Sequence, residues 1–363
     1  MGDDMGDTSD FSVIHSPAGD TLPVAKRRNA EGGARNGAEP AALLEFIDHH
    51  RGWLQDQLAT RGAALLRGFG LATPAQFEAA ARAVEPVLKN EYLGTSPRDA
   101  LTPYVFSASE LPPYYPIPQH CEMTFIKDPP RRLMFACLVA AKRGGETPLV
   151  DMRQVAADLD PAVRGRFETG GIRIIRNYGG PSGSGRFDLW QLKRWDEIFQ
   201  TTDRAVVEAK CAAQGVFTDL RWGPGDRLRL ISEHEALRAH PETGVPVWFN
   251  HAQVFHLSAA PAELRRIYQR TGELRSLALW RFAQAAVAAK RRFTASDEQA
   301  LHCTHRGGRE IADADLEHLR DVIWKHMIAE PWQAGDMVVI DNNSISHGRL
   351  PYHGPRQVVV AWA

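Results

Sequence analysis

Cysteine is scarce in this chain, and its scarcity excludes two classes of protein. The 363 residues include four cysteines, none of them in a Cys-x-x-Cys pair: Cys121, Cys137, Cys211 and Cys303. Thiols so widely spaced provide neither a disulfide framework nor a cysteine-rich zinc site. A charge excess is missing as well, because 43 Lys and Arg residues balance 44 Asp and Glu residues. Proteins that bind nucleic acid usually carry a basic excess, so we expect no nucleic-acid partner.

Long apolar runs are also missing. No stretch of the sequence reaches the ~20 apolar residues of a membrane-spanning helix, so we expect no membrane contact. The first residues, MGDDMGDTSD, are acidic, whereas a secretory signal begins with positive charge. We therefore expect a cytoplasmic protein. Hydrophobic residues make up 44% of the chain and charged residues 24%, a balance typical of a globular protein with a sizeable core.

The N-terminal part of the sequence predicts a leader followed by helices. Residues 1–40 are rich in Gly, Asp, Asn and Ala, and we expect them to be loosely ordered, with one short strand near residues 11–15. A helix opens at Glu39, and apolar residues then recur at the helical period on one buried face: Leu43, Ile47, Leu54 and Leu58. The segment TPAQ (73–76) fits a capping box with proline at the first helical position, which predicts a second helix to about Leu88.

Strand-like sequences lie at both ends of the remaining chain. They are short apolar runs at 62–69, 133–141, 147–151, 337–340 and 357–363. Between them the sequence mixes helical patterns with short strands, and long helices are expected to begin near Pro261 and Ala312. Because strands at both ends must pair in one sheet, we predict a mainly β fold class with helical insertions. We expect one domain over residues 41–363, with the helical insertion at about 152–330.

A segment rich in proline and tyrosine leads into the first candidate site residues. The prolines of residues 101–119 exclude a regular helix and predict an extended loop that forms a pocket wall. Directly after it, His120 and Glu122 are two residues apart, so an extended chain would place both on one face. An imidazole and a carboxylate are two of the three ligands of the 2-His-1-carboxylate triad that holds Fe(II). The His-x-Glu pattern is weak by itself, because a half-buried strand with a satisfied histidine gives the same letters.

A second group of residues, near the C-terminus, strengthens this interpretation. Residues 331–363 contain a strand, a turn, His347 and then Arg356 at the start of the final strand. His347 is the candidate for the third ligand, which must come from a distant strand. Arg356 can reach the same pocket, and a planar guanidinium holds a carboxylate through two hydrogen bonds. A dicarboxylate cosubstrate that chelates iron at one end needs such an anchor at the other.

These motifs together resemble a known family. His-x-Glu at 120–122, GGETPLVD at 144–151 and WxxGDxxxxDNxxxxHGRxPYxGPR at 332–356 resemble the taurine dioxygenase (TauD/TfdA-like) family of Fe(II)/2-oxoglutarate-dependent oxygenases. The resemblance covers about residues 60–363. It is closest to the subgroup of amino-acid-tailoring hydroxylases that includes SyrP and clavaminate synthase, whose further landmarks are similar to TSPR (95–98) and HPETGVPVWFN (240–250).

The resemblance implies a fold and a set of site residues. The implied fold is a double-stranded β-helix (jelly-roll) core, and the implied activity is that of a dioxygenase using Fe(II), 2-oxoglutarate and O2. His120, Glu122 and His347 match the iron ligands of the family. Arg356 and Thr147 match the residues that hold the distal carboxylate of 2-oxoglutarate.

Departures from the family pattern narrow the chemistry. Taurine dioxygenase holds the substrate sulfonate with a second arginine, four residues after the anchor, where this sequence has Val360. A sulfonate substrate is therefore not expected. The carboxylate ligand is Glu122, whereas the iron halogenases have Ala or Gly there and bind chloride in the vacant position. Halogenation is not expected either.

The substrate is the least explicit feature of the sequence. The subgroup resemblance implies an amino acid or amino-acid derivative, hydroxylated at an unactivated carbon in secondary metabolism, with Arg98, Asn250 and Arg349 as candidate substrate contacts. Alternatives are the same chemistry on an aminoacyl thioester tethered to a peptidyl carrier protein, and desaturation or cyclisation of a small metabolite. The sequence shows no isolated basic helix that would receive an acidic carrier, which favours a free small-molecule substrate.

Two other classes of protein remain open. A metal-binding jelly-roll protein without redox activity has no need of a dicarboxylate anchor, and a zinc hydrolase usually carries a helical His-Glu-x-x-His motif, which is missing. The segment HCTH (302–305) has the letters of a metal site but lies in a polar stretch without a partner cluster. We interpret it as a pair of loop histidines.

Overall fold

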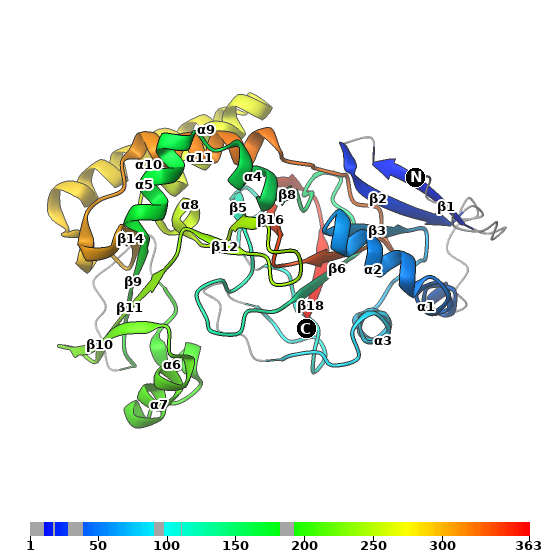
Figure 1. Ribbon diagram of the computed structural model, residues 1–363, viewed down its shortest axis with the longest axis horizontal. Helices are drawn as coiled ribbons and strands as arrows, with labels where there is room; N and C mark the ends of the chain where they lie inside the picture. The colour runs from blue at the N-terminus through cyan, green and yellow to red at the C-terminus, as the bar shows by residue number, and fades with distance from the viewer. Residues whose placement is uncertain (1–10, 17–18, 28–38, 91–97, 110, 182–191) are drawn as a thin grey trace.

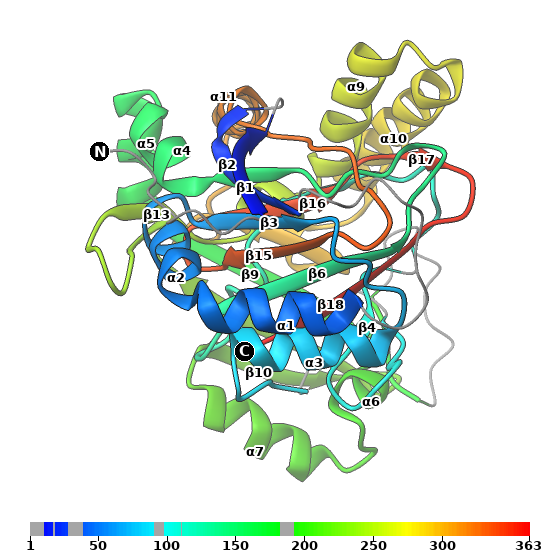
Figure 2. The same cartoon turned by 90° about the vertical axis from the view of Figure 1, so that its right-hand side faces the viewer.

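A computed structural model describes residues 11–16, 19–27, 39–90, 98–109, 111–181 and 192–363 (Figures 1 and 2). Its largest sheet has the strand order β1-β2-β3-β15-β6-β18-β4. The strands are β1 (Phe11–Ser16), β2 (Gly19–Arg27), β3 (Ala63–Arg67), β15 (Met337–Asp341), β6 (Arg132–Val139), β18 (Gln357–Trp362) and β4 (Phe106–Ser107). Neighbours are antiparallel except β2 and β3, which are parallel. Strands from both ends of the chain therefore share one sheet, as the sequence predicts.

Both faces of this sheet are buried, because successive side chains of a strand point to opposite faces and those of the central strands are apolar on both. Leu66 and Met134 lie on the face that three helices cover, and Leu65 and Phe135 lie on the opposite face. The covering helices are α1 (Glu39–His49), α2 (Arg51–Thr60) and α3 (Pro74–Val84). In Figure 2, α1 and α3 lie side by side below the central strands, in blue and cyan, and α2 lies to their upper left.

A smaller sheet faces the other side of the seven-stranded sheet. Its order is β5-β16-β8, and its strands are β5 (Ile117–His120), β16 (Ile345–Arg349) and β8 (Leu149–Asp151). Leu149 and Ile345 of this sheet belong to the same hydrophobic cluster as Phe135 and Val338 of the large sheet. The two sheets thus share one core. A two-stranded ladder continues it, formed by β7 (Arg143–Gly144) and β17 (Tyr352–His353).

The segment between β8 and β15 forms the other half of the molecule (Figure 1). It contains a four-stranded sheet of β10 (Phe217–Gly223), β11 (Arg227–His234), β9 (Ile172–Tyr178) and β14 (Leu301–Thr304), and a ladder of β12 (Leu237–Ala239) and β13 (Pro246–Trp248). Its helices are α4 (Met152–Asp158), α5 (Pro161–Gly170), α6 (Trp195–Phe199), α7 (Arg204–Gln214), α8 (Ala252–Phe255), α9 (Ala259–Thr271), α10 (Leu274–Phe293) and α11 (Asp313–Lys325). In the described ranges, no helix is long and apolar enough to cross a membrane.

Some predicted boundaries differ from the observed ones for local reasons. The capping box at Thr73 is present, but α3 ends at Val84 because Glu85 precedes a proline and takes an extended conformation. The single long helix expected from Pro261 is two helices, α9 and α10, separated at Gly272, which has a φ of 67°. The leader contributes two strands, β1 and β2, to the large sheet instead of one short strand.

Candidate active site

The register of two neighbouring strands brings the two predicted histidine ligands together. β5 and β16 are antiparallel, and His120 lies directly opposite His347. The centroids of the two imidazole rings are 4.4 Å apart. This contact joins residues from distant parts of the chain, so it depends on the pairing of β5 with β16.

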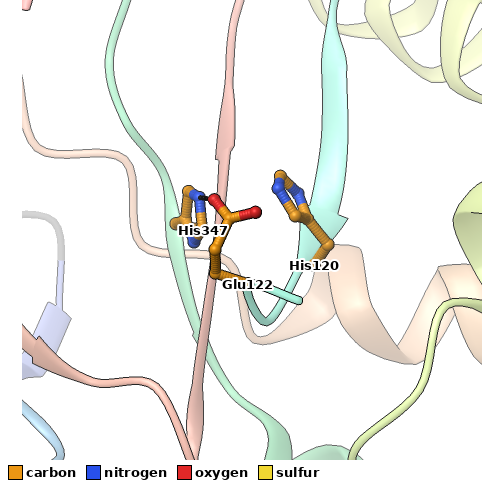
Figure 3. Close-up of side chains that lie close together, drawn as sticks. All are labelled: His120, Glu122 and His347. Atoms are coloured by element: carbon orange, nitrogen blue, oxygen red, sulfur yellow. Dashed lines mark ion pairs between the residues drawn. The ribbon is translucent and has the colours of Figure 1, made fainter. Parts of the chain in front are cut away.

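Glu122 reaches the same point through a turn. β5 ends at His120, and Met123 takes a left-handed backbone conformation with a φ of 52°. The Glu122 Oε2 atom lies 3.7 Å from Nε2 of His347, and the ligand atoms of the three side chains are within 4.8 Å of one another (Figure 3). The expectation that one extended strand aligns His120 and Glu122 is therefore wrong, although the two side chains do converge.

A buried asparagine holds the backbone of this turn. Oδ1 of Asn342 accepts a hydrogen bond from the backbone N–H of Glu122 at 2.6 Å. Its Nδ2 donates to the carbonyl oxygens of Glu122 at 3.0 Å and Pro130 at 2.8 Å. Asn342 directly follows β15 and has no exposed surface. Its amide takes the place of a strand partner and fixes where the Glu122 carboxylate lies.

The protonation of the histidines suits a metal ion. Nδ1 of His120 lies 2.9 Å from the carbonyl oxygen of Pro118, an acceptor, so Nδ1 is the donor and Nε2 is the nitrogen left to bind a metal ion. Burial, followed by the neighbouring His120 and Arg98, lowers the pKa of His347 well below its usual value, so His347 is neutral. Nδ1 of His347 is buried and has no hydrogen-bond partner in the part of the chain that is described. Two neutral imidazoles and a carboxylate are the donor set of a non-haem Fe(II) site, so these residues fit that ion.

Arg98 compensates the charge of the Glu122 carboxylate. Its Nη2 lies 2.6 Å from Oε2 of Glu122, and both side chains are 5% exposed. Oε2 is also the oxygen that faces His347. The guanidinium therefore orients the carboxylate as well as neutralising it.

One cavity is lined by the two histidines of the triad and by the predicted cosubstrate anchor. Its lining includes His120 and His347 together with Thr147 and Arg356, and the other lining residues are Arg98, Ala108, Ser109, Ile117, Phe135, Gly348 and Arg349. A ligand in this cavity is thus in reach of both groups. The four residues come from β5, β16, the segment before β8 and the segment before β18.

The Thr147 hydroxyl is prepared to donate a hydrogen bond. Its Oγ1 accepts from Nη2 of Arg356 at 3.3 Å and from Nε1 of Trp332 at 3.1 Å. A hydroxyl has two lone pairs and one proton. Because both lone pairs are occupied, the proton of Thr147 remains available to an acceptor in the cavity.

Arg356 is a half-buried cation without a carboxylate partner among the described residues. Its Nε donates to the carbonyl oxygen of Gly145 at 2.8 Å. Burial, followed by the charge of Arg349, lowers the pKa of Arg356 to about 10. Withdrawing a cation from water costs free energy unless the cation is paired. A carboxylate in the cavity would supply that pair, so these residues fit the far end of a dicarboxylate.

The family model named "Taurine catabolism dioxygenase TauD, TfdA family" matches residues 23–362 of the chain. The chain belongs to this family. It is 30% identical over 324 residues to the dapdiamide synthesis protein DdaC of Enterobacter agglomerans, covering 88% of this chain and 87% of that protein. It is 26% identical over 367 residues to a clavaminate synthase-like protein of Arabidopsis thaliana, with coverage of 97% and 93%.

Solved structures of low sequence identity share the fold of this TauD/TfdA-family chain. PvcB of Pseudomonas aeruginosa has a TM-score of 0.52 at 13% identity, covering 100% of this chain and 94% of PvcB. Another PvcB structure, described as an Fe, alpha-ketoglutarate dependent oxygenase from an isonitrile synthetic pathway, has a TM-score of 0.50 at 14% identity, with coverage of 97% and 90%. As a member of the TauD/TfdA family, the protein is a dioxygenase, and its cofactors are Fe(II), 2-oxoglutarate and O2.

The three candidate substrate contacts have different surroundings. Arg98 and Arg349 line the cavity, but Arg98 pairs with Glu122, and Arg349 donates to the carbonyl oxygens of Leu111, Pro112 and Tyr115. Arg349 therefore fastens the proline- and tyrosine-rich loop to the strand that carries His347. Asn250 lies before α8, where its side chain donates to the Ala236 carbonyl and accepts from the backbone N–H of Ala252. All three side chains therefore already make hydrogen bonds or ion pairs within the protein.

Two residues of the TauD/TfdA-family site are not evident from sequence reasoning. Trp332 looks like a core residue in the sequence, yet its indole N–H donates to Thr147. Asn342 is part of a turn in the sequence, and nothing there indicates that its partner is Glu122, 220 residues earlier. The signal that was available is their place in the family motif, where both letters fall at fixed distances from His347.

The interpretation of HCTH as loop histidines is wrong, because His302 is buried on β14 beside His256 and Glu310. Nδ1 of His302 accepts from the backbone N–H of Leu257, and Nδ1 of His256 accepts from that of Ser258. Each ring therefore carries its proton on Nε2, which faces Oε2 of Glu310 at 3.1 Å from His302 and 3.8 Å from His256. The two rings hold the pKa of Glu310 well below its usual range. A metal ion would need the nitrogens that carry these protons. We therefore interpret the cluster as structural: the two imidazoles hold the Glu310 carboxylate in place.

Proposed function

We propose that this TauD/TfdA-family dioxygenase hydroxylates an unactivated carbon of an amino acid or amino-acid derivative. The observation that carries the proposal is that His120, His347, Thr147 and Arg356 line a single cavity beside Glu122. The relative DdaC, named for dapdiamide synthesis, and the subgroup motifs support an amino-acid-derived substrate.

In this proposal His120, Glu122 and His347 hold the iron, and Arg356 with Thr147 holds the distal carboxylate of 2-oxoglutarate. When bound, these cofactors supply the oxidation: 2-oxoglutarate, O2 and R–H give succinate, CO2 and R–OH. The residues supply position. Arg356 offers a cation, and the Thr147 hydroxyl offers the one proton that Trp332 and Arg356 leave unused.

Other residues keep the reacting centre dry and rigid. The Phe135 ring lies 4.9 Å from the His347 ring and 2% of the residue is exposed, so it covers one side of the imidazole. The His120 imidazole is fixed by the Pro118 carbonyl at its Nδ1 atom. A ring oriented in this way presents its other nitrogen in one direction, which favours tight metal binding.

The first test is metal binding and succinate release. His347→Ala is expected to weaken Fe(II) binding at least ~10-fold and to abolish 2-oxoglutarate-dependent succinate formation, because one of three ligands is lost. Fe(II) binding is measured anaerobically by equilibrium dialysis and succinate by mass spectrometry. The matched control is His353→Ala, a histidine on β17 whose side chain is 58% exposed. Wild-type iron affinity and turnover in His347→Ala would contradict the triad.

The second test addresses the substrate. A free amino acid needs a cation for its α-carboxylate, and Arg98 is the candidate that also lies at the iron ligands. Screening the twenty amino acids for coupled succinate formation distinguishes a free substrate from a carrier-tethered one. Turnover only on aminoacyl thioesters of a carrier protein would favour the tethered alternative. Failure of both, with iron and 2-oxoglutarate bound, would place the substrate outside the amino acids.

We also propose that the seven-stranded and three-stranded sheets are the two walls of a jelly roll. Their shared hydrophobic cluster and the likeness to PvcB support this assignment. In this interpretation residues 41–363 are one domain, and residues 152–330 are the insertion that covers the open end of the site.

A further inference from the structure

Helix α10 differs from the rest of the molecule in its charge. Its 20 residues, LRSLALWRFAQAAVAAKRRF, include five basic residues and no acidic one, in a chain whose total charge is nearly balanced. It packs along α9 at the periphery, as both views show in yellow (Figures 1 and 2). The expectation that this chain has no isolated basic helix is therefore wrong.

The side of α10 that faces away from α9 is partly apolar. The buried residues Ser276, Ala283 and Val287 lie on one side of the helix. Leu274, Phe282 and Phe293 are 76%, 58% and 74% exposed. At 100° per residue Leu274 falls on the opposite side together with exposed arginines and alanines, and Phe282 and Phe293 fall on one flank of that side. We call this face the α10 stripe: Leu274, Arg281, Phe282, Ala285, Arg292 and Phe293.

The arginines of the α10 face lack acidic partners within the described residues. Arg281 donates to the amide oxygen of Gln284, and Arg292 lies over the Phe293 ring. By contrast, Arg291 on the flank of the helix makes two hydrogen bonds to Asp313. The uncompensated cations are thus those that alternate with the exposed apolar side chains.

One end of α10 adjoins the loop that walls the active site. The Arg275 guanidinium lies 3.8 Å from the centre of the Tyr114 ring. Tyr114 belongs to the loop whose Pro112 and Tyr115 carbonyl oxygens accept hydrogen bonds from Arg349, a residue of the cavity lining. From this loop the helix extends outward over ~30 Å, at 1.5 Å per residue.

We propose that the α10 stripe is the docking face for an acidic helical carrier protein that presents the substrate on a tether. This inference rests on the proposed function and specifies its partner. Arginines without acidic partners favour an acidic surface, and the alanine within the stripe allows the close approach of another helix. Phe282 and Phe293 provide the apolar anchors that such an interface needs at its centre. A carrier on this face has the loop at Tyr114 beside it, so its tether would enter the cavity there.

The test measures binding of a holo-peptidyl carrier protein with acidic helices, by isothermal titration calorimetry at low and high salt. The double variant Arg281→Glu/Arg292→Glu is expected to weaken binding at least ~10-fold, and Phe282→Ala to weaken it ~5-fold or more. The matched control is Arg221→Glu/Arg227→Glu, which changes the net charge equally on exposed residues of the β10–β11 hairpin. It is expected to leave binding unchanged.

Four outcomes would overturn the proposal. The first two are no binding of the holo carrier at low salt and equal weakening of binding by both double variants. The other two are binding of anionic phosphatidylserine vesicles instead of the carrier, and a dimer of this chain that dissociates in Arg281→Glu/Arg292→Glu. Fe(II) and 2-oxoglutarate binding is measured on the same proteins. If the wild type binds the carrier but not iron, the proposed function fails and the docking face stands. If Arg281→Glu/Arg292→Glu binds iron normally and the carrier does not bind the wild type, only the docking face fails.

Discussion

At the scale of single residues, the Thr147 hydroxyl group has both of its lone pairs in hydrogen bonds. Thr147 accepts hydrogen bonds from an indole and from a guanidinium, so only its proton is left to bond a group in the cavity. Trp332 therefore acts at one remove from the cavity, since it determines what Thr147 can offer. The same arrangement ties the position of Thr147 to that of Arg356, so the two groups that would bind one carboxylate are set by each other.

This arrangement predicts a selective loss in Thr147→Val. The variant keeps the shape of the side chain but has no proton to donate, so the Kd of 2-oxoglutarate should rise ~5- to 10-fold, the equivalent of about 1 kcal/mol. Fe(II) binding should stay as in the wild type. Both are measured anaerobically, by calorimetry and dialysis. Thr147→Ser should restore most of the affinity, and an unchanged Kd in Thr147→Val would contradict the assigned role.

The turn at Glu122 predicts a second selective loss. Asn342→Ala removes two hydrogen bonds to the backbone of the proposed ligand Glu122 and one to that of Pro130, so Fe(II) affinity should fall ~10- to 100-fold. The neighbouring Asn343 provides the control, because it bonds to Arg238 and Asp341 and not to Glu122. If Asn343→Ala weakens iron binding as much as Asn342→Ala, the effect is one of general stability.

At the scale of elements, a buried ion pair joins the end of strand β3 to the residue that precedes β15. Nη2 of Arg67 lies 2.8 Å from Oδ2 of Asp336, and its Nη1 lies 2.8 Å from Oε1 of Glu330. Asp336 has no exposed surface and also accepts from the backbone N–H of Gln333. Asp336 lies just before the strand that leads to Asn342 and to the proposed iron ligand His347.

Breaking this pair is expected to be costly. Asp336→Ala leaves a buried guanidinium short of its main partner, so the free energy of unfolding should fall by about 3 kcal/mol. Urea denaturation followed by circular dichroism measures the change. Asp48→Ala, on the exposed side of α1, should change it by less than ~0.5 kcal/mol. A loss of equal size in both variants would remove any special role of the pair.

The elements that the sequence predicts well are those with one dominant signal. Continuous apolar runs identify β6 and β15, because both faces of those strands are buried. The capping box identifies the start of α3. The character of α10 is not evident in the same way, because its charges lie among alanines and next to the acidic residues of neighbouring helices. Only the break at Gly272 separates it from α9 and leaves its basic side exposed.

The candidate site, too, has a part that the sequence predicts and a part that depends on the fold. His120, Glu122 and His347 can be chosen from residue types and family motifs. Their contact depends on the register of β5 and β16 and on a left-handed residue, Met123, which no local pattern specifies.

At the scale of the whole molecule, buried neutral histidines make stability depend on pH. Burial, as the largest cause, lowers the pKa of His234 and of His256 to about 4 in each case. In the unfolded chain a histidine titrates near 6.5. Between these values the unfolded state binds protons that the folded state does not, so the contribution of these residues to stability is complete above ~6.5 and is lost as the pH falls toward 4.

The expected result is a fall in the free energy of unfolding below pH ~6.5, by up to about 1.4 kcal/mol per pH unit for each such histidine. Urea denaturation at about pH 7, 6 and 5 measures the slope. His234→Gln should reduce the slope by up to about 1.4 kcal/mol per pH unit, the equivalent of one proton. His353→Gln, on exposed β17, should leave the slope unchanged. A slope that is the same in wild type and His234→Gln would exclude His234 as a source.

The pairing of early with late strands has a consequence for biosynthesis. β6 lies between β15 and β18 in the large sheet, and β5 needs β16 beside it. While the chain emerges from the ribosome, at ~5–20 residues per second, one edge of β3 and both edges of β6 wait for partners that come roughly two hundred or more residues later. Until residues 337–362 are released, neither the sheet nor the His120–His347 contact can form. The nascent chain thus exposes unpaired strand edges throughout most of its synthesis. A premature stop before Met337 removes the strands β15, β16, β17 and β18 together with the proposed metal ligand His347 and the proposed carboxylate anchor Arg356.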